Sequence, residues 1–203
     1  MLFRSWQAAT ALGVQRQLNL EPFVTAQMYY SLVGRELEYD FQSCAEYHQL
    51  GVLVWSALAG GYLSGKYTQA ESAQAGTRFA EAGQFVPFDW AKGEPILAAL
   101  RTVAEGHGVS MARVAYAWTL SRPAVASVII AARKIGNLDD NIAAADLKLS
   151  PTDLELLNTA SDPGTPYPKW MVLQLDQAED PRPKILEPEK FKDGGPWKDL
   201  RLK

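Results

Sequence analysis

The stretch that decides the fold is Gly51-Val-Leu-Val-Trp-Ser-Ala-Leu-Ala-Gly-Gly-Tyr-Leu-Ser-Gly-Lys-Tyr67. It begins with an apolar run, residues 52–55, that predicts a strand buried on both faces. Three glycines and Lys66 follow; glycines let a backbone aim N–H groups at an anion, and a lysine adds positive charge for phosphate. The stretch matches neither GxxxxGK(S/T) nor GxGxxG, so it fits either a phosphate-binding loop or an ordinary strand and turn.

The composition is that of a soluble globular protein. The 203 residues are 47% hydrophobic and 21% charged, enough for a real core in one domain. A formal net charge of -3 gives no reason to expect nucleic acid or an anionic membrane as a partner. The single cysteine, Cys44, cannot form an internal disulfide, which fits the cytoplasm. We expect no membrane span and, with only two isolated histidines, no metal site.

Three segments resemble motifs of bacterial aldo-keto reductases, in the same order and spacing. Residues 55–67 resemble W-S-P-L-A-x-G-x-L-(T/S)-G-K-Y, and residues 127–141 resemble V-I-x-G-A-(R/K)-x-x-x-(Q/R)-L-x-x-N. Residues 27–35 are similar to Q-x-x-Y-(S/T)-x-x-x-R, and the resemblance runs from about residue 3 to residue 171. The resemblance implies a (β/α)8 barrel that binds NADPH without a Rossmann motif and reduces aldehydes or ketones to alcohols.

The resemblance also implies a set of residues that contact NADP(H). Two match nicotinamide contacts, four match positions along the pyrophosphate, and three match positions at the 2′-phosphate and adenine. In that order they are Gln27 and Trp55; Ser56, Leu58, Gly60 and Lys66; and Arg133, Asn137 and Asn141. Without the resemblance, the same residues are explained as lumen or core residues of a barrel, a turn, and the polar face of a helix.

The sequence departs from the family pattern in several places. Ala57 replaces a proline, Ala131 replaces a glycine, and Asn137 replaces the usual Gln or Arg. The family's Ser-Asn pair, which holds the carboxamide, aligns with Met1 and Leu2, so the similarity begins just after the fifth strand. The first five strands and the family's catalytic Tyr, Asp, Lys and His have no counterpart. We therefore assign no catalytic residue and expect the chain alone to be inactive.

The predicted fold is α/β, a partial (β/α)8 TIM barrel of about three parallel strands with flanking helices. Residues 1–161 would be the last three strands of the barrel, and residues 162–203 a Pro-rich C-terminal tail. The expected strands are residues 23–29, 52–55 and 127–131. The expected helices are residues 3–12, ended by Gly13, then 36–50, ended by Gly51, then about 95–106, and two more capped by Ser110 and Ser150. A long loop, residues 68 to about 92, carries Arg78, a candidate for a phosphate or substrate carboxylate.

Two functions stay open. The first is an NADPH-dependent aldo-keto reductase acting on small carbonyls, with the missing half supplied elsewhere. The second is a non-catalytic truncated relic or nucleotide-binding module. In both cases open sheet edges favour self-association, or pairing with a chain that carries the missing strands.

Overall fold

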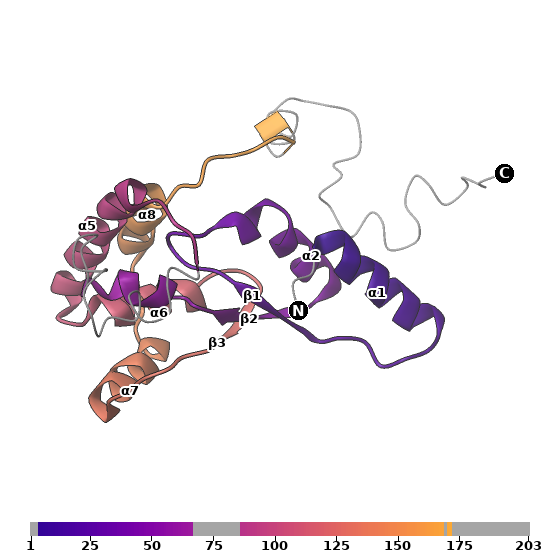
Figure 1. The fold of residues 1–203 in the computed structure, drawn as a ribbon, viewed down its shortest axis with the longest axis horizontal. Coiled ribbons are helices and arrows are strands. Elements are labelled where there is room, and N and C mark those ends of the chain that lie inside the picture. Colours follow the sequence, from indigo (N-terminus) through magenta and orange to yellow (C-terminus); the bar gives the residue numbers. More distant parts are fainter. Residues whose placement is uncertain (1–3, 67–85, 169, 172–203) are drawn as a thin grey trace. The chain divides into compact units, whose positions relative to one another are not determined.

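The computed structural model describes residues 4–66, 86–168 and 170–171 (Figure 1). The chain divides into two compact units, Met1–Pro163 and Gly164–Lys203. Every helix and strand named below belongs to the first unit. Several expectations lie outside the described residues: those for Met1 and Leu2, for Arg78 and most of its loop, and for most of the Pro-rich tail.

The first unit is built on a parallel sheet of three strands. They are β1 (Thr25–Tyr29), β2 (Gly51–Trp55) and β3 (Val125–Val128). The central strand, β2, pairs in parallel with both neighbours, in the order β1-β2-β3. Within the described residues this sheet stays open and does not close into a barrel. The predicted fold class, part of a barrel with three parallel strands and flanking helices, is confirmed.

The third strand lies earlier in the chain than the predicted range of 127–131. Its last bond to the sheet runs from the N–H of Ile129 to the carbonyl of Val54, at 2.8 Å. Beyond Trp55 the central strand turns away, because Ser56 adopts a left-handed backbone with φ of 56°. The residues after Ile129 therefore have no neighbouring strand to pair with, although they continue the apolar run.

Within the described residues, helices cover one face of the sheet. Paired residues of parallel strands point to the same face. The register thus places Ala26, Met28, Val52, Val54, Val125 and Val128 on the covered face, and Gln27, Tyr29, Leu53, Trp55 and Ser127 on the other. Val52 and Val54 are fully buried, whereas Leu53 is half-buried and Ser127 is exposed. The prediction that residues 52–55 are buried on both faces therefore holds for one face of β2 only, and β3 likewise leaves one face exposed at Ser127.

Along the chain, helices lie before, between and after the three strands. The longer ones are α1 (Ser5–Gln17), α2 (Phe41–His48), α5 (Trp90–His107), α6 (Met111–Leu120), α7 (Ile135–Ile142) and α8 (Pro151–Ala160). Three short 3-10 turns complete them: η1 (Glu36–Tyr39), η2 (Ala59–Ser64) and η3 (Ala143–Ala145). Figure 1 shows α5, α6 and α8 grouped together, and α5 contacts both of the others. Among the helices in the described ranges, none is long and apolar enough to cross a membrane.

Two predicted helix caps are confirmed. The side chain of Ser110 accepts a hydrogen bond from the N–H of Arg113 at the start of α6. At the start of α8, Ser150 and Asp153 form a reciprocal capping box, in which the Ser150 N–H donates to Asp153 at 2.8 Å. These caps are local in sequence, which is why the sequence identifies them.

Other helix boundaries differ from the prediction. The helix α1 continues through Gly13, so this glycine does not end it. A Cβ added at Gly13 would meet no other atom within 4 Å. The predicted helix of residues 36–50 breaks at Asp40 into η1 and α2, and Gln49, with φ of 57°, ends α2 in place of Gly51. The helix α5 begins at Trp90, because Asp89 caps it by accepting from the Ala91 N–H. The predicted loop therefore ends earlier than residue 92.

Candidate cofactor-binding site

The two residues predicted to contact nicotinamide lie on neighbouring strands and on one face of the sheet. Gln27 pairs with Leu53, and Tyr29 pairs with Trp55, near the carboxyl ends of β1 and β2. Gln27 is exposed and Trp55 is half-buried, so this face can be reached in the described structure. In parallel α/β folds, ligands bind at the carboxyl ends of the strands, where these residues lie.

The loop after β2 is shaped by left-handed backbone positions. Gly60 has φ of 70° and Gly61 φ of 103°, values that glycine adopts without steric cost. The loop uses most of its N–H groups internally: Gly60 donates to the Ser56 hydroxyl at 3.3 Å, and Gly61 donates to the Leu58 carbonyl at 2.9 Å. Ala59, Leu63 and Gly65 also donate within the loop. The expected row of outward-pointing N–H groups is therefore not formed at these positions, and side chains remain the available donors.

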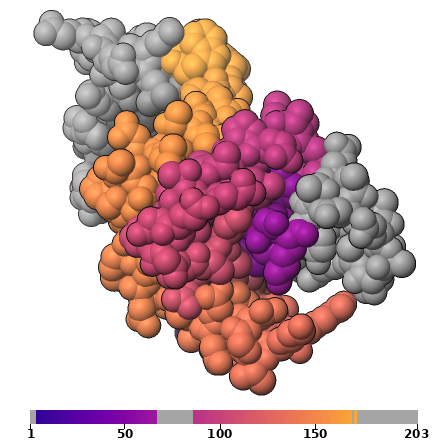
Figure 2. All heavy atoms as spheres, turned by 90° about the vertical axis from the view of Figure 1, so that its left-hand side faces the viewer, coloured from indigo at the N-terminus to yellow at the C-terminus, as the bar shows by residue number. Residues whose placement is uncertain are grey.

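Apolar contacts anchor this loop on two helices. The ring of Tyr62 is fully buried, with its centroid 4.4 Å from that of Phe88 and 4.9 Å from that of Trp90 at the start of α5. Gly65 lies against Met111 of α6. Burial raises the pKa of Tyr62 to about 12, and its hydroxyl has no hydrogen-bond partner within the described residues. Figure 2 shows η2 at the surface, in purple, beside α5 in magenta.

The predicted phosphate-binding cations lie on the surface. Lys66 at the end of the loop is exposed, as are Arg133 and Asn137 at the start of α7. Both η2 and α7 contact α6, which connects the two segments through one helix. Asn141, by contrast, is only 8% exposed, so its side chain is not open to a ligand in this structure. The structure thus presents two exposed cations for an anionic ligand and buries one of the predicted contacts.

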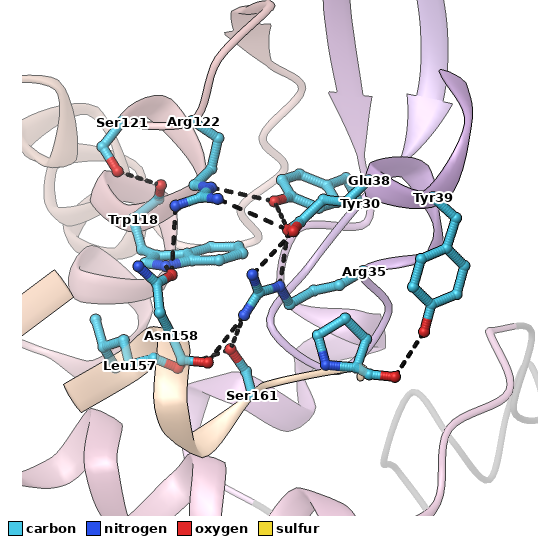
Figure 3. Close-up of polar contacts among 11 residues, drawn as sticks. Tyr30, Arg35, Glu38, Tyr39, Trp118, Ser121, Arg122, Leu157, Asn158 and Ser161 are labelled. Carbon is cyan, nitrogen blue, oxygen red and sulfur yellow. Dashed lines mark hydrogen bonds and ion pairs between the residues drawn. The ribbon is translucent and has the colours of Figure 1, made fainter. Parts of the chain in front are cut away.

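The segment that follows β1 forms a charged network with residues of and near α6 and α8, which was not predicted from the sequence (Figure 3). The Arg35 guanidinium donates to both carboxylate oxygens of Glu38, at 2.7 and 2.9 Å, to the Asn158 carbonyl of α8, and to the hydroxyl of Ser161 just after that helix. Tyr30 also donates to Glu38. Burial alone would raise the pKa of Glu38, but the hydrogen bonds from Arg35 and Tyr30 hold it below its usual value.

The same network encloses an indole ring. Trp118 donates to the Asn158 side chain at 2.9 Å, and its ring lies between the guanidinium groups of Arg35 and Arg122, at 5.5 and 5.2 Å from its centroid. Arg122 also reaches Tyr30 and Asn158. These groups already satisfy one another, so the network ties α6 and α8 to the segment after β1 and offers little to a ligand. In the sequence, the motif of residues 27–35 contains Tyr30 and Arg35, but nothing in it indicates their partners on α8.

Neither of the two principal cavities in the described part of the chain lies at the predicted site. The larger, about 510 Å³, lies between the segment after β1, the start of α5 and the end of α8. The smaller, about 250 Å³, lies between the starts of α1 and α2 and the end of β1. None of the nine predicted residues lines either cavity. Nor does any cluster of three or more His, Cys, Asp or Glu suited to a metal occur in the residues that the structure describes.

Comparisons with known proteins agree with the resemblance. The model of the Aldo/keto reductase family matches residues 5–162. An uncharacterized oxidoreductase, YrpG of Bacillus subtilis (strain 168), is 33% identical over 77% of this chain and 46% of its own length. Protein tas of Escherichia coli (strain K12) is 32% identical over 70% of this chain and 42% of its own, and aldo-keto reductase ausK of Emericella nidulans is 31% identical over 80% and 41%. The chain spans less than half the length of these relatives, and it belongs to the aldo/keto reductase family.

Proposed function

We propose that this chain is the cofactor-binding part of an NADPH-dependent oxidoreductase that reduces aldehydes or ketones to alcohols. The observation that carries the proposal is the family match over residues 5–162, together with Gln27 and Trp55 on one accessible sheet face. The bound cofactor would supply the hydride. The chain's own residues would bind and orient it, and we expect no turnover by the isolated chain, because we assign no residue here to the family's catalytic set.

Each part of the cofactor has residues assigned to it. Gln27 would bind the carboxamide and Trp55 would cover the nicotinamide ring. Side chains and loop atoms of Ser56, Leu58, Gly60 and Lys66 would line the pyrophosphate, and Arg133, Asn137 and Asn141 would line the 2′-phosphate and adenine. The exposed positions of Lys66 and Arg133 fit this assignment, since cationic side chains at the surface can reach a phosphate group from solvent. The internally bonded loop and the buried Asn141 fit it less well, and both weaken the affinity expected of this chain.

Titration of the purified chain with NADPH, followed by fluorescence, tests the proposal. We expect weak binding that weakens further as salt is raised, because exposed charges are screened. Lys66→Ala and Arg133→Ala should each reduce affinity, whereas Lys148→Ala and Arg101→Ala, at exposed positions outside the proposed site, should not. An NADPH affinity that is unchanged in both Lys66→Ala and Arg133→Ala would refute the assignment.

A parallel assay of NADPH oxidation with a small aldehyde tests the second half of the proposal. We expect no turnover above that of a blank. Steady oxidation that is lost in Lys66→Ala would show that the chain is an enzyme by itself, and no binding at millimolar NADPH would leave the non-catalytic relic as the better description.

The composition and the open sheet edges bear on two further points, the cellular compartment of the chain and its association with other chains. We propose that it works in the cytoplasm, since its single cysteine cannot form an internal disulfide. In the described residues β1 and β3 each pair only with β2, so each leaves one edge open. Open edges promote pairing with another chain. We therefore expect self-association to rise with concentration in sedimentation experiments; a monomer at all concentrations would contradict this.

A further inference from the structure

The ring of Trp55 rests against a second aromatic ring. Tyr29 is its register partner on β1, so both side chains point to the same face of the sheet. The two ring centroids are 5.3 Å apart, and the ring planes are tilted by 44°. Aromatic pairs at this separation attract each other beyond simple burial. Tyr29 therefore restricts the orientations open to the indole of Trp55.

Tyr29 is itself held in place by a short turn. Its hydroxyl forms a hydrogen bond of 2.8 Å with the hydroxyl of Ser31, which is fully buried. Ser31 and Gly34 bond to each other through both backbone pairs, at 3.0 and 3.1 Å. A Cβ on Gly34 would lie 2.3 Å from Cε1 of Tyr29, so only glycine leaves room for the ring. The turn thus fixes Tyr29 at both its ring and its hydroxyl.

We propose that Tyr29 is a positioning residue that sets the Trp55 ring in the orientation needed to cover a nicotinamide. The proposal rests on the proposed function, which assigns the nicotinamide to Trp55. Tyr29 acts through Trp55 and does not exchange a proton: burial raises the pKa of Tyr29 to about 12, so the phenol stays protonated at neutral pH. Gly34 and Ser31 contribute by holding Tyr29.

The test compares two ligands that differ only in the nicotinamide, NADP⁺ and 2′-phospho-ADP-ribose, on the full 203-residue chain. Tyr29→Leu should weaken NADP⁺ binding by about three- to tenfold and leave 2′-phospho-ADP-ribose binding unchanged. Tyr29→Phe keeps the ring and should retain most of the affinity. Equal weakening of both ligands, or no weakening of either, would overturn the proposal.

A second readout needs no ligand. In a fluorotryptophan-labelled chain, the fluorine NMR signal of Trp55 is the one of six that Trp55→Phe removes. Tyr29→Leu should shift this signal, and an unchanged signal would overturn the proposal. If Tyr29→Leu does not fold, Gly34→Ala, which displaces the same ring, takes its place with the same expected shift. If the unchanged chain binds neither ligand, the proposed function fails and the cofactor role of Tyr29 fails with it; the signal then still decides whether Tyr29 fixes Trp55.

Discussion

Two regions of the first unit hold their shape by opposite means. In the segment after β1, Glu38 pairs with Arg35 and Arg122, and Arg35 also donates to the Asn158 carbonyl of α8 and to Ser161, so these charged groups bind to partners inside the protein. After β2, the η2 loop is held by buried rings and left-handed glycines, and it leaves Lys66 exposed. The difference shows which charges are open to a ligand. The charges in the segment after β1 stabilise the fold, whereas the charge of Lys66, after η2, remains available for an anion.

The largest loss of stability should come from breaking the ion pair between Arg35 and Glu38. Arg35→Ala removes the short ion pair to Glu38, which keeps the hydrogen bond from Tyr30 and the ion pair with Arg122 at 3.9 Å, and it removes the bonds to Asn158 and Ser161. Loss of one member of a buried ion pair costs about 3–5 kcal/mol. Urea unfolding should show this loss, whereas Arg101→Ala on the exposed side of α5 should stay within about 0.5 kcal/mol. Similar midpoints for the two variants would mean that the network is not a structural tie.

A smaller effect should come from crowding the anchor of the η2 loop. A Cβ at Gly93 would lie 2.3 Å from the Tyr62 hydroxyl, so Gly93→Ala should destabilise by about 1–3 kcal/mol. Gly106 lies in the same helix and has open space around it, so Gly106→Ala should be neutral or stabilising by up to about 1 kcal/mol. Thermal unfolding distinguishes the two signs. If both substitutions stabilise the chain, Tyr62 does not anchor the loop as described.

A third prediction concerns an exposed pair that joins α5 to α8. The hydrogen bond from His107, 2.9 Å between Nε2 and Oδ2, holds the pKa of Asp153 below its ordinary value. Because the folded-state pKa is lowered, this stabilisation is present above the unfolded carboxyl pKa of about 3.9 and is lost as pH falls through the folded value. Asp153→Asn should lower Tm at neutral pH and lessen the drop in Tm as the pH falls below the unfolded carboxyl pKa of about 3.9. Asp139→Asn, an exposed carboxylate on α7, is the control and should keep the full drop.

The sequence was sufficient where the determining chemistry is local. The apolar run of β2 and the caps at Ser110 and Ser150 each depend on residues within a few positions, and all three were predicted. The break at Asp40 and the turn at Ser56 depend on backbone angles that neither residue type signals. For this reason, predicted helix and strand boundaries were wrong even where the helix or strand itself was predicted.

The charged network could not be predicted because its partners are far apart in sequence. Arg35 bonds to Asn158 and Ser161, more than a hundred positions away, and only the folded sheet brings them together. The motif that contains Tyr30 and Arg35 was recognised, yet without a role for either residue. In the candidate site, pairing register placed Gln27 and Trp55 on one face, whereas the burial of Asn141 depends on how α7 packs.

Energy transfer from tryptophan to bound NADPH, titrated on the unchanged chain and on a Lys66→Ala/Arg133→Ala double variant, tests whether these two cations bind the cofactor. Charge-assisted hydrogen bonds to phosphate contribute about 1.5–3 kcal/mol each, so each lost cation should weaken binding by about tenfold or more. We expect saturable transfer in the unchanged chain and none over the same concentration range in the double variant. Equal titration curves for the two proteins, with both folded, would contradict the claim that the exposed cations Lys66, after η2, and Arg133, before α7, bind the cofactor.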